Sequence, residues 1–355
     1  MRRIRNKHKQ TNTPLKRRIF VGMSGGVDSS VSAALLKEQG FKVVGIHLKC
    51  WNIDGCADQD AEDARRAAEV LQIPFYTFDF EKEYKERVVE YMVEGYRSGI
   101  TPNPDVMCNH EIKFGLFFQR AMQLGADYVA TGHYAKTKKG RLYAGRDKNK
   151  DQSYFLWRLT KDQLLKSIFP LGDLKKPQVR KLAKKHRLPN ALKKDSQGVC
   201  FLGEISLPVF LEQFIPMREG EIIASSGEVL GNHKGAHQFT IGQRRGLKIG
   251  GLKEAHYVIE KDLKANTVVL GLEDDPKAYS KEITLTDCNF LAKARRKVLA
   301  RIRYRQPLQK AELKKNFLVF EKAQKFVAEG QSAVFYDSKG EELLGGGVIA
   351  EKKSA

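Results

Sequence analysis

The chain has 355 residues, with 63 Lys or Arg against 42 Asp or Glu and a formal net charge of +21. This length predicts two or three domains with enough chain for a hydrophobic core. No apolar run approaches the ~18–20 residues that cross a bilayer, and no apolar stretch of ~7–15 residues follows the basic N-terminus, so neither a membrane span nor a secretory signal is expected. Five widely separated cysteines are typical of free thiols in a reducing cytosol, which predicts a cytoplasmic protein.

The basic residues gather in three clusters. Residues 1–18 carry eight Lys or Arg, residues 175–194 carry nine, and residues 293–315 carry ten against the single acid Glu312. One such cluster can be a solvated face, but three of them favour a long polyanion, of which nucleic acid is the commonest. The first cluster lacks apolar periodicity, so we expect a disordered basic arm over residues 1–17.

In the first 130 residues, segments with the apolar pattern of a β-strand alternate with segments that have the apolar pattern of an α-helix. The patterns predict, in chain order, strand Arg18–Met23, helix Ser29–Gln39, strand Lys42–Leu48, helix Asp58–Gln72, strand Pro74–Phe80, helices Glu81–Arg97 and His110–Leu124, and strand Asp127–Thr131. Short strand–helix units of this kind indicate an α/β fold, a Rossmann-like parallel sheet with helices on both faces. We assign residues 18–215 to this domain.

The pattern changes from about Pro216. Turn residues separate short β-rich pieces, which are His256–Glu260, Thr267–Leu270, Glu282–Thr286, Lys297–Tyr304, Phe317–Phe320, Ser332–Tyr336 and Gly346–Ala350. We therefore expect a small β-rich central domain over residues 216–279 and a C-terminal β-barrel over residues 280–355.

The clearest chemical signal is the segment Ser24–Ser30, SGGVDSS, between the first strand and the first helix. Adjacent glycines allow a tight turn with N–H groups near an anion, and the helix N-terminus favours negative charge. A glycine turn capped by Ser29 is the structural alternative. The loop has no Walker lysine and is not a GxGxxG fingerprint, which disfavours a kinase or a dehydrogenase. It resembles the loop of the N-type ATP pyrophosphatases (the PP-loop superfamily), which cleave ATP between the α and β phosphates and adenylate a substrate.

Two cysteines are candidates for chemistry. Cys108 follows two prolines, and the helix expected from about Asn109 would lower its pKa through the helix N-terminus. Asp105 is a candidate proton carrier, and Cys200 lies in the predicted loop DSQGVCFLG. Isolated cysteines are usually small buried hydrophobes, so a structural role stays open beside a redox or nucleophilic pair.

Metal chemistry has weak support in the sequence. Cys50 and Cys56 are too far apart for a CxxC knuckle, so we expect no metal site and read this pair as structural. An iron–sulfur cluster that uses Cys108 and Cys200 stays open.

Further strings resemble the bacterial-type tRNA 2-thiouridylases, the tRNA-uridine 2-sulfurtransferases. They are NPDVMCN around Cys108, DSQGVCFLG around Cys200, ATGHY (130–134), KDQSY (150–154), TIGQRRG (240–246), RYRQ (303–306), GQSAVFY (330–336) and GGGVI (345–349). The resemblance runs in order from about Arg18 to Ile349. Two departures are Ile205, where the family pattern usually has Arg, and the long basic arm, to which we assign no role.

The resemblance implies a role for each matching position. ATP would be bound by Gly22, Met23, Ser24, Gly25, Gly26, Val27, Asp28, Ser29, Leu48 and Gly132. The target base would be met by Asn103, Pro104 and Asp105. Other contacts to tRNA would come from His133, Lys150, Asp151, Gln152, Arg303, Tyr304 and Gln331, the last three in the C-terminal barrel. Cys200 would carry a persulfide, and Cys108 would be the second catalytic thiol.

The implied reaction is ATP-dependent 2-thiolation of the wobble uridine of tRNA. ATP would adenylate the uridine 2-oxygen, with Mg²⁺ on the departing pyrophosphate, and sulfur would pass from the Cys200 persulfide while a transient Cys108–Cys200 disulfide forms. The expected partners are a flipped-out base of tRNA and a persulfide donor or sulfur-relay protein. Three alternatives are an RNA thiolase that acts at another uridine position, a small-molecule adenylating ligase, and a non-enzymatic RNA-binding protein.

Overall fold

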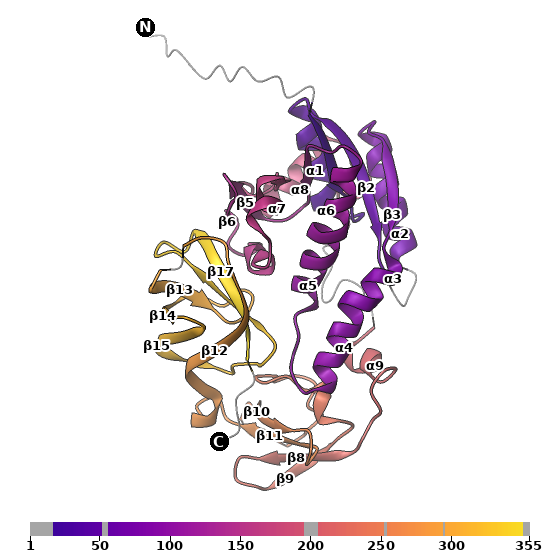
Figure 1. Cartoon of the computed structure of the whole chain (residues 1–355). Helices are drawn as coiled ribbons and strands as arrows, with labels where there is room; N and C mark the ends of the chain where they lie inside the picture. Colours follow the sequence, from indigo (N-terminus) through magenta and orange to yellow (C-terminus); the bar gives the residue numbers. More distant parts are fainter. Residues whose placement is uncertain (1–16, 52–55, 195–204, 252–253, 294, 351–355) are drawn as a thin grey trace.

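The computed structural model describes residues 17–51, 56–194, 205–251, 254–293 and 295–350 of the chain (Figure 1). Cys200 and the basic arm expected over residues 1–17, apart from Arg17, lie outside these ranges. In the described residues no helix has both the length and the apolar character needed to cross a membrane.

A five-stranded parallel sheet forms the first part of the molecule, in the order β3-β2-β1-β4-β7. Its strands are β1 (Arg18–Gly22), β2 (Lys42–Lys49), β3 (Phe75–Asp79), β4 (Tyr128–Ala130) and β7 (Ser167–Ile168). Val21 of the central strand pairs with Gly45 on one side and Ala130 on the other, and its side chain is fully buried. Burial on both faces explains why β1 reads as a continuous apolar run.

Helices cover both faces of this sheet. One face packs against α1 (Val27–Glu38), α2 (Cys56–Val70) and α8 (Lys176–Lys185), and the other packs against α6 (Phe117–Gln123). The predicted Rossmann-like α/β fold is confirmed.

Two longer helical segments run from the sheet toward the rest of the molecule (Figure 1). The first comprises α3 (Glu81–Tyr84), a π-helical stretch Lys85–Val89 and α4 (Glu90–Arg97). The second comprises α5 (Pro104–Met107), a π-helical stretch Cys108–Leu116 and α6. The prediction that this helix begins near Asn109 or His110 is wrong, because it begins at Pro104. Asn103 caps it by accepting a hydrogen bond from the Val106 backbone N–H at 3.3 Å, and proline suits the first helical position.

The central region holds a four-stranded sheet in the order β10-β11-β8-β9. Its strands are β8 (Gly220–Ala224), β9 (Val229–His233), β10 (Tyr257–Asp262) and β11 (Thr267–Gly271). Its core includes Ile222, Val258 and Leu270, all fully buried. The short 3-10 turn Ala236–Gln238 contacts both α4 and α9 (Leu207–Leu211), so this region docks on the helical part of the first domain.

The C-terminal strands close into a six-stranded antiparallel barrel. Its strands are β12 (Tyr279–Phe290), β13 (Lys297–Arg301), β14 (Gln309–Lys314), β15 (Phe317–Lys325), β16 (Ser332–Tyr336) and β17 (Glu342–Ile349). Pairing of β12 with both β15 and β17 closes the ring, which confirms the predicted barrel.

The barrel sheet continues into the first domain. The hairpin β5 (Ala135–Lys138) and β6 (Arg141–Ala144) adds to β17, with Leu142 opposite Leu343. The sequence patterns had not indicated this hairpin. The segment that follows it reaches the same interface, where Trp157 donates to Ser332 Oγ at 3.0 Å and Tyr154 donates to the Ser332 carbonyl at 2.8 Å.

Candidate nucleotide and thiol site

The SGGVDSS segment lies where β1 meets α1, at the carboxyl edge of the parallel sheet. Gly25 has φ of +72°, and a Cβ there would lie 2.3 Å from the Asp60 backbone oxygen. A Cβ on Gly132 would lie 2.7 Å from the Ser29 backbone nitrogen. Both positions therefore require glycine. Gly25 needs it because of its positive φ and its close contact with Asp60, and Gly132 needs it because of its close contact with Ser29.

Hydroxyl groups hold the shape of this loop. Ser29 Oγ accepts from the Ser24 backbone N–H at 3.2 Å and donates to the Gly26 carbonyl at 3.1 Å. Ser30 Oγ donates to the same carbonyl at 3.1 Å. Both serines are almost fully buried, so their side chains fix the loop, and the groups that could meet an anion are backbone N–H groups at the start of α1.

Asp28 is the charged group of the loop. Its carboxylate accepts a hydrogen bond from Tyr134 Oη at 2.9 Å and is paired with Lys176 Nζ, 2.8 Å from each oxygen. Tyr134 belongs to the ATGHY string, and Lys176 begins α8. Neither residue was among those expected to act at the site, although Lys176 lies in the second basic cluster.

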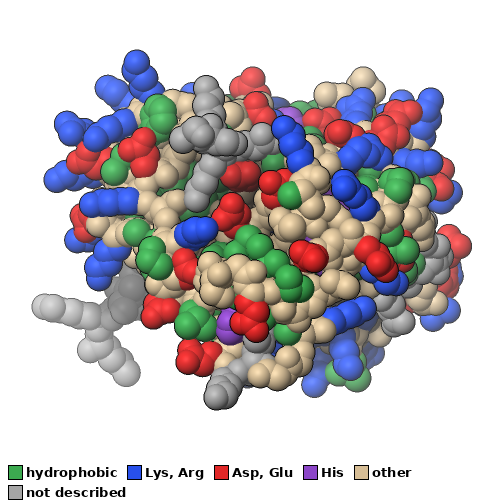
Figure 2. Space-filling view, turned by 90° about the horizontal axis from the view of Figure 1, so that it is seen from below, with side chains coloured by type: hydrophobic (Ala, Val, Ile, Leu, Met, Phe, Trp, Pro, Cys, Tyr) green, Lys and Arg blue, Asp and Glu red, His purple; other side chains and the backbone are tan. Residues whose placement is uncertain are grey.

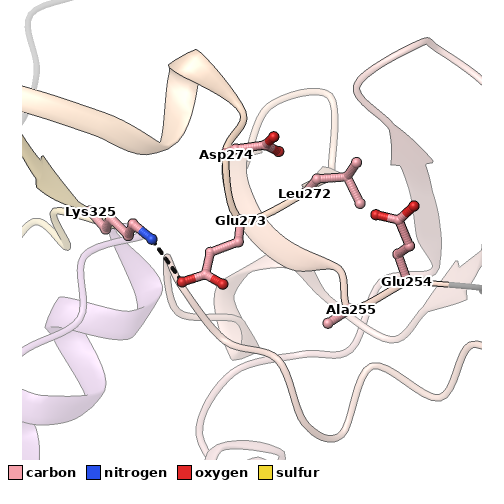
Figure 3. A pocket seen from close by; sticks show the side chains of 6 residues that line it. All are labelled: Glu254, Ala255, Leu272, Glu273, Asp274 and Lys325. Atoms are coloured by element: carbon pink, nitrogen blue, oxygen red, sulfur yellow. Dashed lines mark hydrogen bonds and ion pairs between the residues drawn. The ribbon is translucent and has the colours of Figure 1, made fainter.

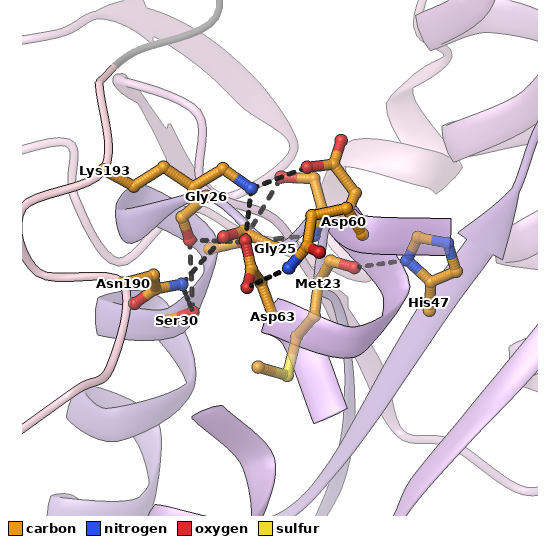
Figure 4. A network of polar contacts seen from close by, with 12 residues as sticks. Met23, Gly25, Gly26, Ser30, His47, Asp60, Asp63, Asn190 and Lys193 are labelled. Carbon is orange, nitrogen blue, oxygen red and sulfur yellow. Dashed lines mark hydrogen bonds and ion pairs between the residues drawn. The ribbon is translucent and has the colours of Figure 1, made fainter. Parts of the chain in front are cut away.

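A second polar network joins the loop to the chain after α8 (Figure 4). Asn190 Nδ2 donates to the Gly25 carbonyl at 2.8 Å and to Ser30 Oγ at 2.9 Å. Lys193 Nζ lies 2.7 Å from Asp60 Oδ1 and 2.5 Å from Asp63 Oδ2 on α2. The loop is therefore held from β1, α2 and α8 together.

Leu48, the residue of β2 expected to bind the nucleotide, also lies at this edge, next to His47, for which no role was expected. His47 Nδ1 is 3.2 Å from the Met23 carbonyl, and burial lowers the pKa of His47, so the ring is neutral at pH 7. Leu48, at the end of β2, packs against two clusters, one around Phe114 and Phe117 and one that contains Cys108. An adenosine pocket lined by Leu48 would thus adjoin the environment of the thiol.

Cys108 lies inside the helical segment and only 6% of it is exposed. Burial raises the pKa of the thiol, the Asp105 charge raises it further, and Lys113 and a hydrogen bond with Tyr84 lower it. The expectation of a lowered pKa is wrong for this structure, because Cys108 follows the helix N-terminus by a full turn and sits among apolar side chains. Phe210 and Leu211 of α9 belong to the same cluster.

The residues before Cys108 are mostly buried. Asn103 and Pro104 lie in the interior, whereas Asp105 is half-buried in the first turn of α5. Gln331 of the barrel donates to the Thr101 and Pro102 carbonyls at 2.9 and 3.1 Å. Gln331 thus holds the backbone that leads into this helix, and Asp105 is the member of the expected base-binding trio that reaches the surface.

Several residues expected to contact tRNA are engaged within the protein. His133 is buried between Phe114 and Phe169, with Nδ1 2.7 Å from Thr131 Oγ1. Burial holds the pKa of His133 well below its usual range, so it carries no charge for a phosphate. Gln152 accepts from the Tyr134 N–H at 3.0 Å and, like Lys150, is half-buried.

Asp151 is 97% buried, since 3% of it is exposed. It accepts from the backbone N–H groups of Gly145 at 3.0 Å and Ser153 at 3.1 Å and pairs with Arg301 of the barrel at 3.1 Å. This geometry makes Asp151 a link between the first domain and the barrel.

The barrel residues Arg303 and Tyr304 lie at the junctions between domains. Arg303 donates to the carbonyls of Ile241 at 2.7 Å and Phe326 at 2.5 Å, and burial lowers its pKa. Tyr304 packs against Phe155, with ring centroids 4.5 Å apart. Arg303 thus ties the central region to the barrel, and Tyr304 ties the barrel to the first domain.

A surface pocket lies elsewhere, between β11 and the barrel (Figure 3). It measures about 470 Å³ and is lined by Glu254, Ala255, Leu272, Glu273, Asp274 and Lys325. Lys325 is paired with Glu273 at 2.7 Å, which leaves a net negative lining that repels a triphosphate. Seen from below, the molecular face in Figure 2 has acidic and apolar side chains toward its middle and Lys or Arg mainly around its rim, unlike a uniformly basic nucleic-acid surface.

No group of three or more His, Cys, Asp or Glu side chains that could hold a metal ion occurs in the ranges that the structure describes.

Family models match the chain along most of its length. The model described as the tRNA methyl transferase HUP domain matches residues 17–204, the tRNA methyl transferase PRC-barrel domain matches 209–272, and the aminomethyltransferase beta-barrel domain matches 280–349. The nucleotide loop and Cys108 lie within the first of these matches.

Curated relatives cover nearly the whole chain. The tRNA-specific 2-thiouridylase MnmA of Bacillus subtilis is 44% identical over 95% of this chain and 95% of its own length. The enzymes of the same name from Shouchella clausii and Stutzerimonas stutzeri are 46% and 45% identical and cover 94% and 96% of this chain and 96% of their own lengths. Among solved structures, a 4-thiouridine synthetase in complex with RNA and ATP aligns with 56% of this chain and 50% of its own, at a TM-score of 0.37 and 16% identity.

Proposed function

Since the chain belongs to the tRNA-specific 2-thiouridylases, which are tRNA-uridine sulfurtransferases of the PP-loop superfamily, we propose that it thiolates the wobble uridine of tRNA through an adenylated intermediate and a cysteine persulfide. The observation that supports this most directly is Leu48. It lies at the sheet edge beside the nucleotide loop and also packs against the cluster that contains Cys108. ATP chemistry and thiol chemistry would therefore share one site.

The first step is adenylation. The 2-oxygen of the uracil attacks the α-phosphate of ATP, and pyrophosphate leaves. Backbone N–H groups at the start of α1 bind the phosphates, and Gly25 and Gly132 let the backbones of Asp60 and Ser29 pack against them, which fixes the shape of the loop. Mg²⁺ prefers carboxylate and phosphate oxygens, so Asp28, with its carboxylate at the loop, is the residue that would hold a Mg²⁺ arriving with ATP and neutralising the pyrophosphate.

The second step transfers sulfur. The terminal sulfur of a Cys200 persulfide attacks C2 of the base, and AMP departs with the former 2-oxygen. The Cys108 thiolate then attacks Cys200 Sγ, which forms the Cys108–Cys200 disulfide and releases the 2-thiouridine. A thiol reductant restores both cysteines, and a persulfide donor or relay protein recharges Cys200.

The position of Cys108 is compatible with this pairing. Ile205, where the described chain resumes, packs against the cluster that contains Cys108, and Cys200 precedes it by five residues. Five residues span at most about 18 Å when fully extended. Because burial raises the pKa of Cys108, the thiol needs a base, and half-exposed Asp105, three residues earlier in the same helical segment, would take its proton or one from the target base.

The proposal divides the work among the three parts of the chain. Residues 18–215 would hold ATP, the target base and both thiols. Residues 280–355 would contact tRNA, and residues 216–279 would connect the two.

Nucleoside mass spectrometry tests the proposal. Unmodified tRNA is incubated with protein, ATP, Mg²⁺ and a persulfide donor, and the wild type is compared with Cys200→Ser and Cys108→Ser. Cys288→Ser, in strand β12 of the barrel, is the matched control. We expect 2-thiouridine at the wobble position with the wild type and the control only.

Other outcomes would assign the chain differently. Thiolation that persists in Cys200→Ser would refute the persulfide route. Thiolation at another uridine would keep the chemistry and change the substrate position. Release of AMP and pyrophosphate without thiolation would indicate a small-molecule adenylating ligase.

A further inference from the structure

We propose that Lys176 and Lys193 bind the phosphates of ATP and supply the positive charge that the nucleotide loop lacks. The inference rests on the proposed nucleotide site and adds two residues to it. Both lysines come from α8 and the segment that follows it, far along the chain from the loop.

The loop creates a need for this charge. From Gly22 to Ser30 it contains no Lys or Arg, and its one ionisable residue, Asp28, is negative. The triphosphate of ATP and the pyrophosphate that leaves it are strongly anionic. Backbone N–H groups and the α1 dipole provide only partial positive charge, so any full positive charge that the protein adds to that of Mg²⁺ comes from other elements.

Lys176 reaches the loop from the first position of α8. Its ammonium lies 2.8 Å from each oxygen of Asp28, and 13% of its side chain is exposed. Its backbone N–H donates to Asp147 Oδ2 at 2.9 Å, which fixes the start of the helix. A phosphate bound at the α1 N-terminus would therefore meet this ammonium beside Asp28.

Lys193 approaches the other side of the loop (Figure 4). Its partner Asp60 is the residue whose backbone oxygen lies against Gly25. Asn190, three residues earlier, bonds to the Gly25 carbonyl at 2.8 Å, so the segment that carries Lys193 is tied to the loop itself. Burial alone would lower the pKa of Lys193, but the carboxylates of Asp60 and Asp63 together outweigh it and raise the pKa, which keeps the ammonium charged.

Both ion pairs can exchange partners. The side chains of Lys193, Asp60 and Asp63 are 32%, 43% and 20% exposed, so solvent and a ligand can reach them. In the other pair Lys176 is 13% exposed and Asp28 is 29% exposed, so a ligand reaches that pair mainly from the side of Asp28. A carboxylate carries one negative charge, whereas a terminal phosphate carries close to two. In the absence of nucleotide, the carboxylates hold the two ammonium groups at the loop, and bound phosphate takes their place.

Another lysine of the same helix provides a control. Lys185 pairs with Glu38 at 2.9 Å, as Lys176 pairs with Asp28, but it lies in the last turn of α8 and 64% of its side chain is exposed. Glu38 is the last residue of α1, at the opposite end from the nucleotide loop. Loss of Lys185 removes one charge and one ion pair without altering the loop.

The experiment measures binding of pyrophosphate, and of ATP, by isothermal titration calorimetry with Mg²⁺ present. We expect Lys176→Met and Lys193→Met each to weaken pyrophosphate binding at least tenfold and Lys185→Met to change it by less than twofold. Circular dichroism melting of each variant reports whether it is folded. Pyrophosphate affinity equal to wild type in both folded lysine variants would overturn the inference.

The variant Asp63→Asn distinguishes two roles of Lys193: binding of phosphate, and an ion pair that only holds α2 against the loop. If Lys193 only fastens α2 to the loop, Asp63→Asn should weaken pyrophosphate binding as much as Lys193→Met does, and that result would also overturn the inference. If Lys193 binds phosphate, loss of the competing carboxylate should leave binding unchanged or tighter. Failure of the wild type to bind either ATP or pyrophosphate would instead refute the proposed nucleotide site itself.

Discussion

Replacement of Asp151 by alanine tests whether this residue acts inside the protein or on RNA. Its carboxylate accepts two backbone hydrogen bonds, and its ion pair with Arg301 has side chains only 2% and 10% exposed. Breaking a buried pair by removing one partner costs about 3–5 kcal/mol, because the remaining charge stays buried. We expect Asp151→Ala to lower the free energy of unfolding by this amount.

Urea denaturation followed by tryptophan fluorescence measures the effect, since Trp157 donates to Ser332 Oγ across the same interface. Asp173→Ala is the control, because the Asp173 side chain is 82% exposed and its partner Lys136 lies 3.6 Å away, so about 0.5 kcal/mol or less should be lost. The double variant Asp151→Ala/Arg301→Met also removes the unpaired charge of Arg301. Its loss of unfolding free energy should therefore be about 1–3 kcal/mol smaller than the sum of the losses in the two single variants. A wild-type urea midpoint in Asp151→Ala together with weaker tRNA binding would refute this reasoning and support a direct RNA contact.

Three further predictions concern single positions. Gly25→Ala should abolish measurable ATP binding in calorimetry, because its Cβ meets the Asp60 backbone, whereas Gly227→Ala, with a similar positive φ but no atom within 4 Å, should leave ATP binding intact. Cys108 should react slowly with iodoacetamide at pH 7 and faster as the pH rises above 9, since burial raises its pKa; fast alkylation at pH 7, read by peptide mass spectrometry, would contradict this. Because the pKa of His133 is lowered by folding, the stability that it contributes is present above about pH 6.5, the unfolded value, and is lost as the pH falls. His133→Leu should therefore flatten the acid limb of the urea midpoint, and an unchanged acid limb would argue against a buried neutral ring.

The parallel sheet and the nucleotide loop were predictable from sequence because both depend on local patterns. Continuous apolar strands such as β1 and the glycine pair at Gly25 encode their structure within a few residues. The start of the second long helix was placed too late, at about Asn109, because proline disfavours the interior of a helix and two prolines precede Cys108. Pro104 in fact occupies the first helical turn, where its missing N–H costs nothing. The predicted effect on the thiol pKa then had the wrong sign.

Long-range contacts explain what the sequence did not predict. The burial of Asp151 depends on Arg301, 150 residues away, and the pairing of Lys176 with Asp28 joins residues separated by 148 positions. Neither ion pair can be recognised from the neighbouring sequence, because charged residues in a string such as KDQSY are expected to lie at the surface. The β5–β6 hairpin was also missed, since its strands have four residues each and acquire their partner only from β17.

The pairing of β6 with β17 has a consequence for the order of synthesis. Leu142 and Leu343 are opposite each other in one sheet but are separated by about 200 residues in the chain. During synthesis the hairpin can therefore pair with β17 only after the last strand has been made. Until β17 arrives, β6 offers an open edge beside the apolar side chains of Tyr154 and Trp157, which are fully buried in the finished molecule. In a chain that ends before the barrel, this edge of β6 would stay unpaired and prone to aggregation. The barrel therefore covers the exposed edge of the preceding domain only after the end of the chain has been synthesised. Premature termination near residue 280 should yield a fragment that aggregates instead of a stable nucleotide-binding domain.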